Sequence, residues 1–472
     1  MQGYSVISMI APCHNQGIRS RVFVLILFSA LLFSGCISHE RLYYIAPTVT
    51  PGIRPEMNTS GFWISQHPYP DRIILNRDQI EEFNASIVNE LKSVTDILAH
   101  SPFLYGQELK VRLEQSYRNF VEGEHYQANG RLASLRFFLK IRENIDLEGI
   151  PKEVKTGHGL IIRYANQRIL PVREGLYVER GDLDFDELQN SAMDIGTPLI
   201  ILHQSLDKNW YFTVSSLSEG WIEVDKVALC TEEDLKEFSK PSEFVVVTEP
   251  KANIFLDPLL LKYHGSARMG TKLPLRRRIG KEVLEITLPS KDEDATYAPL
   301  LGYLNEKEVH VGYLSYTPRH MIQQAFELLN APYGWGDTNE EQDCSRFIHE
   351  VFSTAGFMLP RNSAAQAQVG RLVGSFDKET SLNEKLEVLS HEGIGGITLL
   401  RLKGHIMLFL GMADSRPYVI HEIWGYRQKT WKGDIVRVIN RVAVTDLSLG
   451  KESNRGSLLE RLMTVRTMTK TR

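Results

Sequence analysis

One cysteine in a polar, glycine-rich segment places the strongest constraint on this chain. The segment APYGWGDTNEEQDCSRFIHEVF sets Cys344 between Asp343 and Ser345, just before apolar residues at helical spacing. This spacing predicts a helix that begins at or near Cys344, with Gly356 as its carboxy-terminal cap. Because the first amides of a helix are unpaired and positive, that position favours a thiolate. Three interpretations stay open: a buried small side chain, one half of a disulfide, or a nucleophile.

The amino terminus predicts export. Arg19 and Arg21 precede the apolar run VFVLILFSALLF, which is too short to span a bilayer and is typical of a secretory signal peptide. The small residues directly before Cys36 resemble the lipobox of bacterial lipoproteins, which implies that residues 1–35 are removed and that Cys36 is acylated. A plain signal peptide cut elsewhere is the alternative. Ile37, in place of an aspartate, favours the outer membrane, so we expect a lipid-anchored protein at the periplasmic face.

Export limits what the remaining cysteines can do. Of the four cysteines, Cys13 leaves with the signal peptide and Cys36 carries lipid, so Cys230 and Cys344 remain in the folded part. A disulfide between these two is possible in an oxidising compartment. Cys230, however, ends the apolar run VDKVALC and is expected to be a buried small side chain, whereas Cys344 has polar neighbours. No CxxC, HExxH or clustered His/Cys spacing occurs, so the sequence predicts no metal site.

The segments before Cys344 differ in pattern. Residues from about 37 to 75 are rich in proline and aromatics with little periodicity and predict an extended tether or wrapping segment. Apolar residues every three or four positions from Ile80 to Leu98 predict an amphipathic helix within a helical region. Short strand-like runs separated by turn residues follow over 159–230 and 243–316, which is typical of small β-barrels or sandwiches. A net charge of −4 without charge runs gives no reason to expect a nucleic-acid partner.

From Thr317 onward the pattern predicts an α+β domain. Thr317 as N-cap and Pro318 in the first turn predict the start of a helix. Two later strand-like segments, GHIMLFLGM and PYVIHEIWG, predict a hairpin centred near Ala413. Such a hairpin places His405 and His421 directly opposite each other, about 5 Å apart at Cβ. One imidazole would pair with the thiolate and the other would orient the first, although a structural cysteine and buried core histidines fit the same pattern.

The order of these motifs resembles the NlpC family of papain-like cell-wall cysteine peptidases. The resemblance rests on YGWGD, DCSRFIHEVF, GFMLPRNSAAQ, GHIMLFLG and VIHEIWG, and the segment from DFDELQ to EVDKVA is similar to the first bacterial SH3-like domain of multi-domain members. It implies an α+β multi-domain fold with a helical N-terminal region, two small SH3-like β-barrels and a C-terminal papain-like α+β peptidase domain. The expected parts are a lipoprotein-type signal peptide at 1–35, an extended tether with a helical stabilising region at 36–157, SH3-like domains at 158–240 and 241–316, and the peptidase domain at 317–472.

The resemblance also implies an activity, that of a cell-wall cysteine endopeptidase. Such enzymes hydrolyse the bond between γ-D-glutamate and an L-diamino acid, diaminopimelate or lysine, in peptidoglycan stem peptides, and some require a free N-terminal L-Ala. The reaction passes through a thioacyl-enzyme and needs no cofactor. The expected partners are stem peptides or muropeptides, and the membrane through the lipid on Cys36. The sequence carries no signal of an oligomeric state.

Motif positions assign roles within this resemblance. Cys344 matches the nucleophile, His405 the general base and His421 the third, orienting residue. Asp337 in place of a glycine, and Arg346 at a position that is small in many members, depart from the family pattern and bear on the shape of the cleft. The residues expected to contact the substrate are Asp343, Ser345, Tyr333, Arg361 and Ser363.

Two other functions fit the same sequence. SH3-like modules that dock on the cell wall beside an inactive final domain would make a non-catalytic peptidoglycan-binding lipoprotein. A papain-like scaffold also carries amidases and acyltransferases that act on other amides. The presence of Cys344, His405 and His421 together favours the peptidase.

Overall fold

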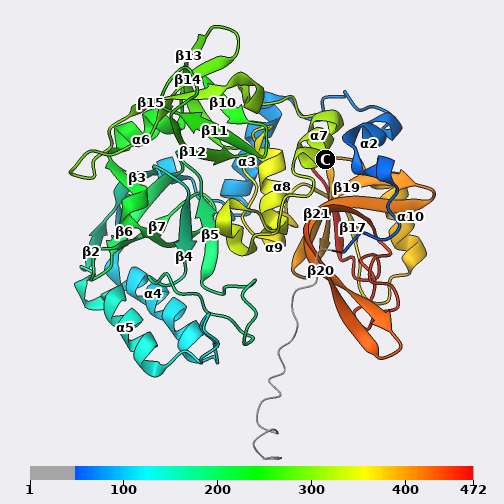
Figure 1. Cartoon of the computed structure of the whole chain (residues 1–472), viewed down its shortest axis with the longest axis horizontal. Coiled ribbons are helices and arrows are strands. Elements are labelled where there is room, and N and C mark those ends of the chain that lie inside the picture. Colours follow the sequence, from blue (N-terminus) through cyan, green and yellow to red (C-terminus); the bar gives the residue numbers. More distant parts are fainter. Residues whose placement is uncertain (1–47, 471–472) are drawn as a thin grey trace, which may run out of the picture. The chain divides into compact units, whose positions relative to one another are not determined.

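The computed structural model describes residues 48–470 and shows an α+β chain built around several antiparallel sheets (Figure 1). The predicted signal peptide, residues 1–35, and the predicted lipidation site at Cys36 lie outside the described residues. Within residues 48–470, no helix is long and apolar enough to cross a membrane. The predicted fold class is confirmed, with helices first, two strand-rich parts next and a mixed α+β part last. The domain boundaries stay predictions.

The first strand-rich part is a seven-stranded antiparallel sheet in the order β5-β4-β8-β7-β6-β3-β9. Its strands are short because tight turns join them, such as the one between β6 and β7, where Lys208 has a φ of +60°. Phe212 and Trp221 pack ring against ring in its core, 5.4 Å apart at the centroids. The strands are β3 (Gly157–Ile161), β4 (Ala165–Arg168), β5 (Gln189–Met193), β6 (Pro198–Gln204), β7 (Trp210–Val214), β8 (Glu219–Glu223) and β9 (Val227–Cys230).

The second strand-rich part repeats this design in the order β12-β11-β15-β14-β13-β10-β16. Helix α6 (Glu232–Ser239), which starts with a capping box, precedes it. Both parts share one hydrophobic core, in which Trp221 and Val245 are fully buried. The strands are β10 (Phe244–Val247), β11 (Lys251–Phe255), β12 (Tyr263–Arg268), β13 (Lys272–Ile279), β14 (Val283–Leu288), β15 (Leu300–Asn305) and β16 (Val309–Val311).

The N-terminal helices divide between the two halves of the structure. α4 (Gly106–Val121) and α5 (Leu135–Ile145) bury their apolar faces in the core of the first sheet. In contrast, α3 (Arg77–Asn89) packs on the last domain, where Phe83 contacts Phe357 edge to face. The helix predicted over 80–98 is wrong beyond the end of α3, because the chain turns there at a residue with positive φ, Lys92. Shorter elements are β1 (Phe103–Tyr105), β2 (Glu153–Lys155), and the 3-10 turns η2 (Ile97–Ala99), η3 (Leu147–Gly149), η4 (Val224–Lys226) and η5 (Glu306–Glu308).

Part of the segment predicted as an extended tether is helical. η1 (Pro55–Asn58) and α2 (Ser60–Gln66) lie within it. Trp63 is only 1% exposed, its indole N–H donates to a backbone carbonyl at 2.8 Å, and its ring lies 5.3 Å from that of Tyr418. A buried tryptophan needs both kinds of partner, so this segment folds as part of the last domain.

The last domain combines a six-stranded antiparallel sheet, in the order β17-β22-β18-β19-β20-β21, with helices. The helix predicted at Thr317 is confirmed, because the Thr317 hydroxyl accepts from the His320 amide at the start of α7. The strands are β17 (Arg371–Ser375), β18 (Thr398–Leu402), β19 (His405–Ala413), β20 (Arg416–Thr430), β21 (Gly433–Asp446) and β22 (Thr464–Thr467). The helices are α7 (Pro318–Glu327), η6 (Trp335–Glu340), α8 (Cys344–Ser353), α9 (Ser363–Gln366) and α10 (Leu382–Glu392).

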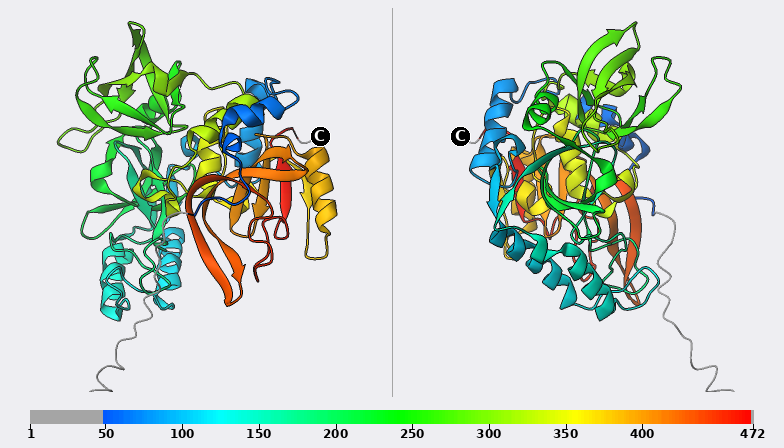
Figure 2. Two further views of the ribbon diagram at one scale, coloured as in Figure 1. Left: turned by 45° about the vertical axis from the view of Figure 1, so that its right-hand side comes forward. Right: turned by 90° about the vertical axis from the view of Figure 1, so that its left-hand side faces the viewer.

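Helix α8 connects the two halves. Its apolar face, including Phe347 and Val351, is fully buried in one core with Ile406 on β19 and Ile420 on β20. In the left view of Figure 2, α8 (yellow) lies between the green strands of the first sheet and the orange strands of the last. The start of α8 is therefore held between parts that lie far apart in sequence.

Candidate active site

Cys344 is the first residue of α8, as the sequence predicts. Asp343 is the N-cap, and its carboxylate accepts from the amides of Ser345 and Arg346 at 3.0 and 2.9 Å. The thiol is 9% exposed and is free, as is that of Cys230. No disulfide therefore joins Cys230 and Cys344.

Burial controls the ionisation of this thiol. It raises the pKa of Cys344 to about 12, and the Asp343 carboxylate adds to the shift, whereas the Ile406 amide, which donates to the sulfur, opposes it. The predicted preference for a thiolate at the helix start is therefore wrong for the resting site, because desolvation outweighs the helix dipole. A base must remove the thiol proton before the sulfur can react.

His405 and His421 form a hydrogen-bonded pair. His405 Nε2 lies 2.7 Å from His421 Nδ1, and His421 Nε2 lies 3.0 Å from Thr445 Oγ1. Thr445, on β21, was not predicted, and its only signal is a polar position in a buried strand. Burial lowers the pKa of His405 to about 4 and that of His421 well below its usual range, so both rings are neutral at pH 7.

The predicted register of this hairpin needs one correction. The turn falls at Asp414 and Ser415, and a bulge near Gly411 shifts the pairing, so that Leu408 faces Ile420. The two histidines are consequently diagonal neighbours instead of direct partners. Diagonal neighbours stay on the same face of the sheet, so the imidazoles still meet.

The two hydrogen bonds of His421 are compatible with two directions. If His405 Nε2–H donates to His421 Nδ1, then His421 Nε2–H donates to the Thr445 hydroxyl, and the lone pair of His405 Nδ1 is free to accept a proton. In the reverse direction, His405 Nδ1 carries the proton instead.

Cys344 and His405 line one pocket of about 230 Å³. Most of its wall comes from the last domain, but Phe185, from the loop before β5, closes one side. The lining residues are Phe185, Tyr333, Trp335, Cys344, Leu402, Lys403, Gly404, His405, Glu422, Ile423, Trp424, Gly425, Arg455, Leu458 and Arg461.

The Phe185 loop is fixed to the last domain by aromatic contacts. The Phe185 ring lies 5.3 Å from Trp335 and 5.2 Å from Trp424, edge to face in both cases. The neighbouring Asp184 carboxylate accepts from the Trp424 indole N–H at 2.9 Å. The sequence could not locate this wall, because it joins residues about 150 to 240 positions apart in the chain.

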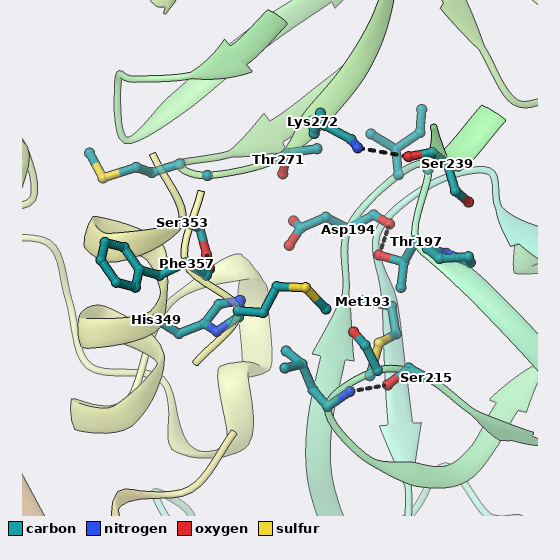
Figure 3. A pocket seen from close by; sticks show the side chains of 18 of the residues that line it. Met193, Asp194, Thr197, Ser215, Ser239, Thr271, Lys272, His349, Ser353 and Phe357 are labelled. Carbon is teal, nitrogen blue, oxygen red and sulfur yellow. Dashed lines mark hydrogen bonds between the residues drawn. The ribbon is translucent and has the colours of Figure 1, made fainter. Parts of the chain in front are cut away.

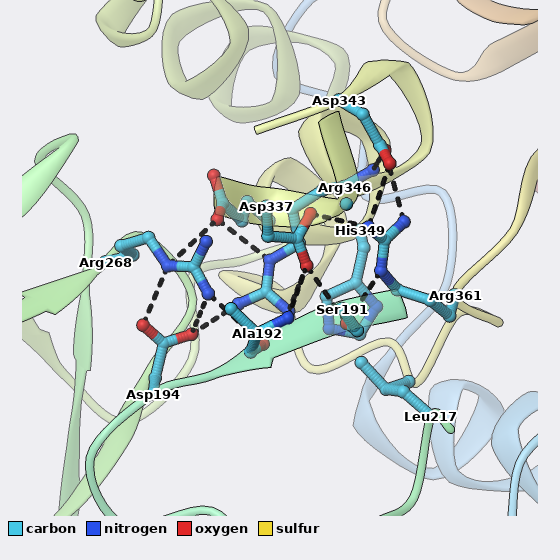
Figure 4. A network of polar contacts seen from close by, with 12 residues as sticks. Ser191, Ala192, Asp194, Leu217, Arg268, Asp337, Asp343, Arg346, His349 and Arg361 are labelled. Atoms are coloured by element: carbon cyan, nitrogen blue, oxygen red, sulfur yellow. Dashed lines mark hydrogen bonds and ion pairs between the residues drawn. The ribbon is translucent and has the colours of Figure 1, made fainter. Parts of the chain in front are cut away.

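Three of the residues expected to contact substrate belong to a buried polar network behind Cys344 (Figure 4). Arg361 donates to both oxygens of Asp343, at 3.1 and 2.8 Å, and to the Ser345 hydroxyl at 3.0 Å. Of the remaining two, Tyr333 lines the pocket, whereas Ser363 is the first residue of α9 and does not. The Asp343 carboxylate is thus already paired.

The two departures from the family pattern extend this network into the first sheet. Asp337 is fully buried and accepts from Arg361 at 2.7 Å and from the Ser191 hydroxyl at 3.1 Å. Arg346 forms an ion pair with Asp194, which also pairs with Arg268 (Figure 4). Neither Asp337 nor Arg346 lines the pocket of Cys344, so their contacts join the sheet to α8.

Glu422 is a pocket residue that the sequence analysis missed. Its side chain is fully buried, and neither carboxyl oxygen has a hydrogen-bond partner within residues 48–470. Burial raises its pKa well above the usual range, and the Asp343 carboxylate adds to the shift. The pocket therefore favours the protonated form of this carboxyl group, and its signal in the sequence is a charged residue inside an apolar strand.

A second pocket, of about 280 Å³, lies where the two strand-rich parts meet α8 (Figure 3). Asp194, Lys272 and His349 line it, and Cys344, His405 and His421 do not. This pocket lies at the junction of the two strand-rich parts with the last domain. No group of three or more potential metal ligands occurs within the described 48–470.

Two segments of the chain match known families. The sequence model of the SH3 domain (SH3b1 type) matches residues 177–223, and that of the NlpC/P60 family matches residues 330–384, which include Cys344. The last domain thus carries an NlpC/P60 segment. The resemblance that the sequence motifs indicate is thereby confirmed, including the SH3-like domain before the NlpC/P60 domain.

Two relatives show how far the likeness extends. The chain is 25% identical to the gamma-D-glutamyl-L-lysine dipeptidyl-peptidase of Bacillus cereus (strain ATCC 10987 / NRS 248) over 180 residues, which are 36% of this chain and 47% of that protein. The match thus spans about half the length of this curated relative. An NlpC/P60 endopeptidase from Photobacterium damselae subsp. piscicida has a similar structure, with a TM-score of 0.72 and 21% identity over 87% of this chain and 97% of that one. This likeness shows the shared fold.

The NlpC/P60 family sets the coarse function. It is a family of cysteine peptidases that act on the cell wall, which implies an exported protein. The family alone does not define which bond this chain cleaves. It also leaves open the roles of the site residues and the presence of a membrane anchor.

Proposed function

We propose that this NlpC/P60 protein is a cysteine endopeptidase that hydrolyses the bond between γ-D-glutamate and an L-diamino acid in peptidoglycan stem peptides. The observation that carries the proposal is that Cys344 and His405 line one pocket. Behind His405, a chain of hydrogen bonds through His421 to Thr445 orients its ring. The name of the Bacillus cereus relative supports the choice of bond.

The geometry suggests how each group acts. His405 Nδ1 takes the proton of the Cys344 thiol as the sulfur attacks the γ-carbonyl carbon of D-glutamate. The protonated His405 then gives this proton to the departing amine of the diamino acid, which leaves a thioester on Cys344. Water, deprotonated by His405, attacks the thioester, and the released thiolate recovers its proton. His421 holds the ring of His405 through both changes of charge.

Phe185, which lines one side of the pocket, affects the length of substrate that fits. It closes the pocket from the SH3 side, and Tyr333 and Trp335 extend the same aromatic surface. A closed end accommodates a short peptide with a free N-terminal L-Ala better than a stem that continues into a sugar. We therefore include short, free stem peptides in the proposed substrate class.

The proposal is tested with the purified protein and two substrates, L-Ala-γ-D-Glu-diaminopimelate and the corresponding muropeptide that retains its sugar. We expect mass spectrometry to detect L-Ala-γ-D-Glu and free diaminopimelate, with faster release from the free peptide. Binding without cleavage would support the non-catalytic lipoprotein. Cleavage at another amide would support an amidase, and transfer to a second amine an acyltransferase.

The pH dependence follows from the two ionisations. The mechanism needs a neutral His405, present above its pKa of about 4, and a protonated thiol, present below about 12. The value of kcat/KM should therefore rise with pH through an apparent pKa well below the usual value for histidine and then stay flat to about pH 9. An acidic limb at or above about 6.5 would contradict it. Circular dichroism at each pH separates this effect from acid unfolding.

We also propose that lipid on Cys36 anchors the protein at the outer membrane, on the basis of the sequence before that residue. Anchoring would bring the pocket to the cell wall. Incorporation of a labelled fatty acid into the wild type but not into Cys36→Ser is expected, and equal labelling of both would contradict it.

A further inference from the structure

The hairpin formed by β20 and β21 ends in an exposed apolar surface. Trp431, in its turn, is 89% exposed, the highest fraction among the large apolar side chains of residues 48–470. Ile435 and Val436, which follow on β21, are 37% and 44% exposed. Residues 427–437 are called the hairpin tip below, and Figure 2 shows the hairpin projecting from the last domain. One exposed apolar side chain is ordinary, but three on one projecting hairpin indicate a surface that contacts another partner.

The hairpin tip is also basic. The Lys432 ammonium lies 4.6 Å from the centre of the Trp431 ring, so that cation and aromatic ring form one surface. With four cations and one carboxylate, the tip has a formal charge of +3 in a chain whose net charge is −4. Tryptophan beside basic side chains is typical of protein surfaces that meet the headgroups of a lipid bilayer. The charged residues of the tip are Arg427, Lys429, Lys432, Asp434 and Arg437.

The chain that follows Cys36 enters the described part of the structure beside this hairpin. The Thr48 amide donates to the Val438 carbonyl at 2.7 Å, and the Arg441 guanidinium donates to the Thr48 carbonyl at 3.3 Å. Val438 and Arg441 both lie on β21, and Val438 is five residues, or about 17 Å of strand, from Gly433 at the tip. The chain from Cys36 to Thr48 can span at most about 40 Å. A lipid on Cys36 would therefore keep the bilayer within reach of the hairpin tip.

We propose that the hairpin tip binds the surface of a bilayer that contains anionic phospholipids. The Trp431 ring then lies at the depth of the headgroups, and the basic side chains contact the phosphates. This inference rests on the proposed lipid at Cys36 and not on the bond that the protein cleaves. A lipid on a connecting segment limits the distance between a domain and the membrane, but leaves the orientation of the domain free. A second contact, made by a hairpin of the domain itself, fixes that orientation.

The contact also sets the height of the catalytic pocket above the bilayer. Trp424 and Gly425, on β20, line the pocket, and Trp431 follows Trp424 by seven positions. Seven residues of a strand extend roughly 24 Å, so the pocket stands about that far from the membrane surface. Neither Trp431 nor Lys432 lines the pocket, so the tip can be changed without altering the groups that cleave a dissolved peptide.

The test uses the purified chain from Ile37 onward. This chain lacks the proposed acylation site and contains all of residues 48–470, which belong to one compact unit. Sedimentation with vesicles measures the fraction of protein bound. We expect binding to phosphatidylglycerol vesicles, weaker binding to phosphatidylcholine vesicles, and loss of binding at high salt.

Variants of the tip identify the groups that bind. Trp431→Ala should weaken binding to phosphatidylglycerol vesicles about tenfold, because a large apolar ring no longer leaves water. Lys429→Glu combined with Lys432→Glu should weaken it at least about tenfold, because two cations become anions. Two matched controls should bind as the wild type does. Tyr263→Ala removes an aromatic side chain that is 61% exposed on β12, and Lys281→Glu combined with Lys378→Glu makes the same change in net charge at exposed positions outside the tip.

Three outcomes would overturn the inference. The first is equal binding to the two kinds of vesicle, and the second is equal binding by the wild type and Trp431→Ala. The third is binding to purified peptidoglycan, in place of vesicles, that is lost in Trp431→Ala, because an exposed tryptophan can also stack on sugar rings. Cleavage of a dissolved stem peptide and fatty-acid labelling of Cys36 are measured separately, so a failure of the proposed activity or anchor is distinguishable from a failure of the hairpin tip to bind.

Discussion

Cys344→Ala is expected to abolish hydrolysis of the stem peptide, with a loss in kcat of roughly 10⁴-fold or more, because the proposed acyl-enzyme forms on the Cys344 sulfur. The fold should survive the change. The thiol is a small buried group that accepts a hydrogen bond from the Ile406 amide, and alanine favours the first turn of a helix. Product release followed by mass spectrometry measures activity, and thermal unfolding checks the structure.

The second free cysteine of residues 48–470 provides the control. Cys230 ends β9, does not line the pocket, and has a pKa that burial raises to about 12, the same value as for Cys344. Cys230→Ala should therefore retain activity. If Cys344→Ala hydrolyses the peptide as fast as the wild type, the nucleophile is another group and the proposed function fails.

The elements that carry this nucleophile were predictable because their signals are local. The apolar residues after Cys344 repeat at helical spacing, and Asp343 before it is a favourable N-cap. The same reasoning placed the start of α7 at Thr317. In each case, the residues that decide the structure lie within a few positions of one another.

The pairing of the histidines was predicted only in part. Strict alternation counted back from the Ala413–Arg416 pair would place His405 and His421 on opposite faces, and the one-residue shift at the bulge returns them to the same face. The residue directly opposite depends on where the chain turns and on the bulge near Gly411. A bulge adds one residue to one strand and has no distinct sequence signal here, so the predicted register was displaced.

The contacts between domains could not be predicted. Phe185 and Asp184 read as residues of a loop, yet they close the pocket against Trp335 and Trp424. The state of the Cys344 thiol also depends on such distant contacts. Its local position favours the thiolate, but the burial that raises its pKa comes from the packed sheets around it.

The buried network at Asp337 is the other place where a single change should have a large effect. Asp337 is fully buried and binds Arg361 and two groups of the first sheet, the Ser191 hydroxyl and the Ala192 amide. Asp337→Ala leaves the Ser191 hydroxyl and the Ala192 amide without this acceptor, and it removes one of the two carboxylates that pair with Arg361, which adds a buried excess of positive charge. We expect a loss of about 3–5 kcal/mol in the free energy of unfolding, measured by denaturant titration.

The loss of stability in Asp337→Ala should arise from the burial of the Asp337 carboxylate, so breaking an exposed ion pair should cost much less. Asp414 pairs with Arg54 at 2.6 Å, but both side chains are about half exposed or more. Asp414→Asn, which suits the positive φ of this turn residue, should therefore cost at most about 1 kcal/mol, because water and salt screen an exposed pair. If Asp337→Ala costs no more than Asp414→Asn, the network does not hold the first sheet to α8. In that case, the fixed position of Phe185 must come from its aromatic contacts and from the hydrogen bond between Asp184 and Trp424.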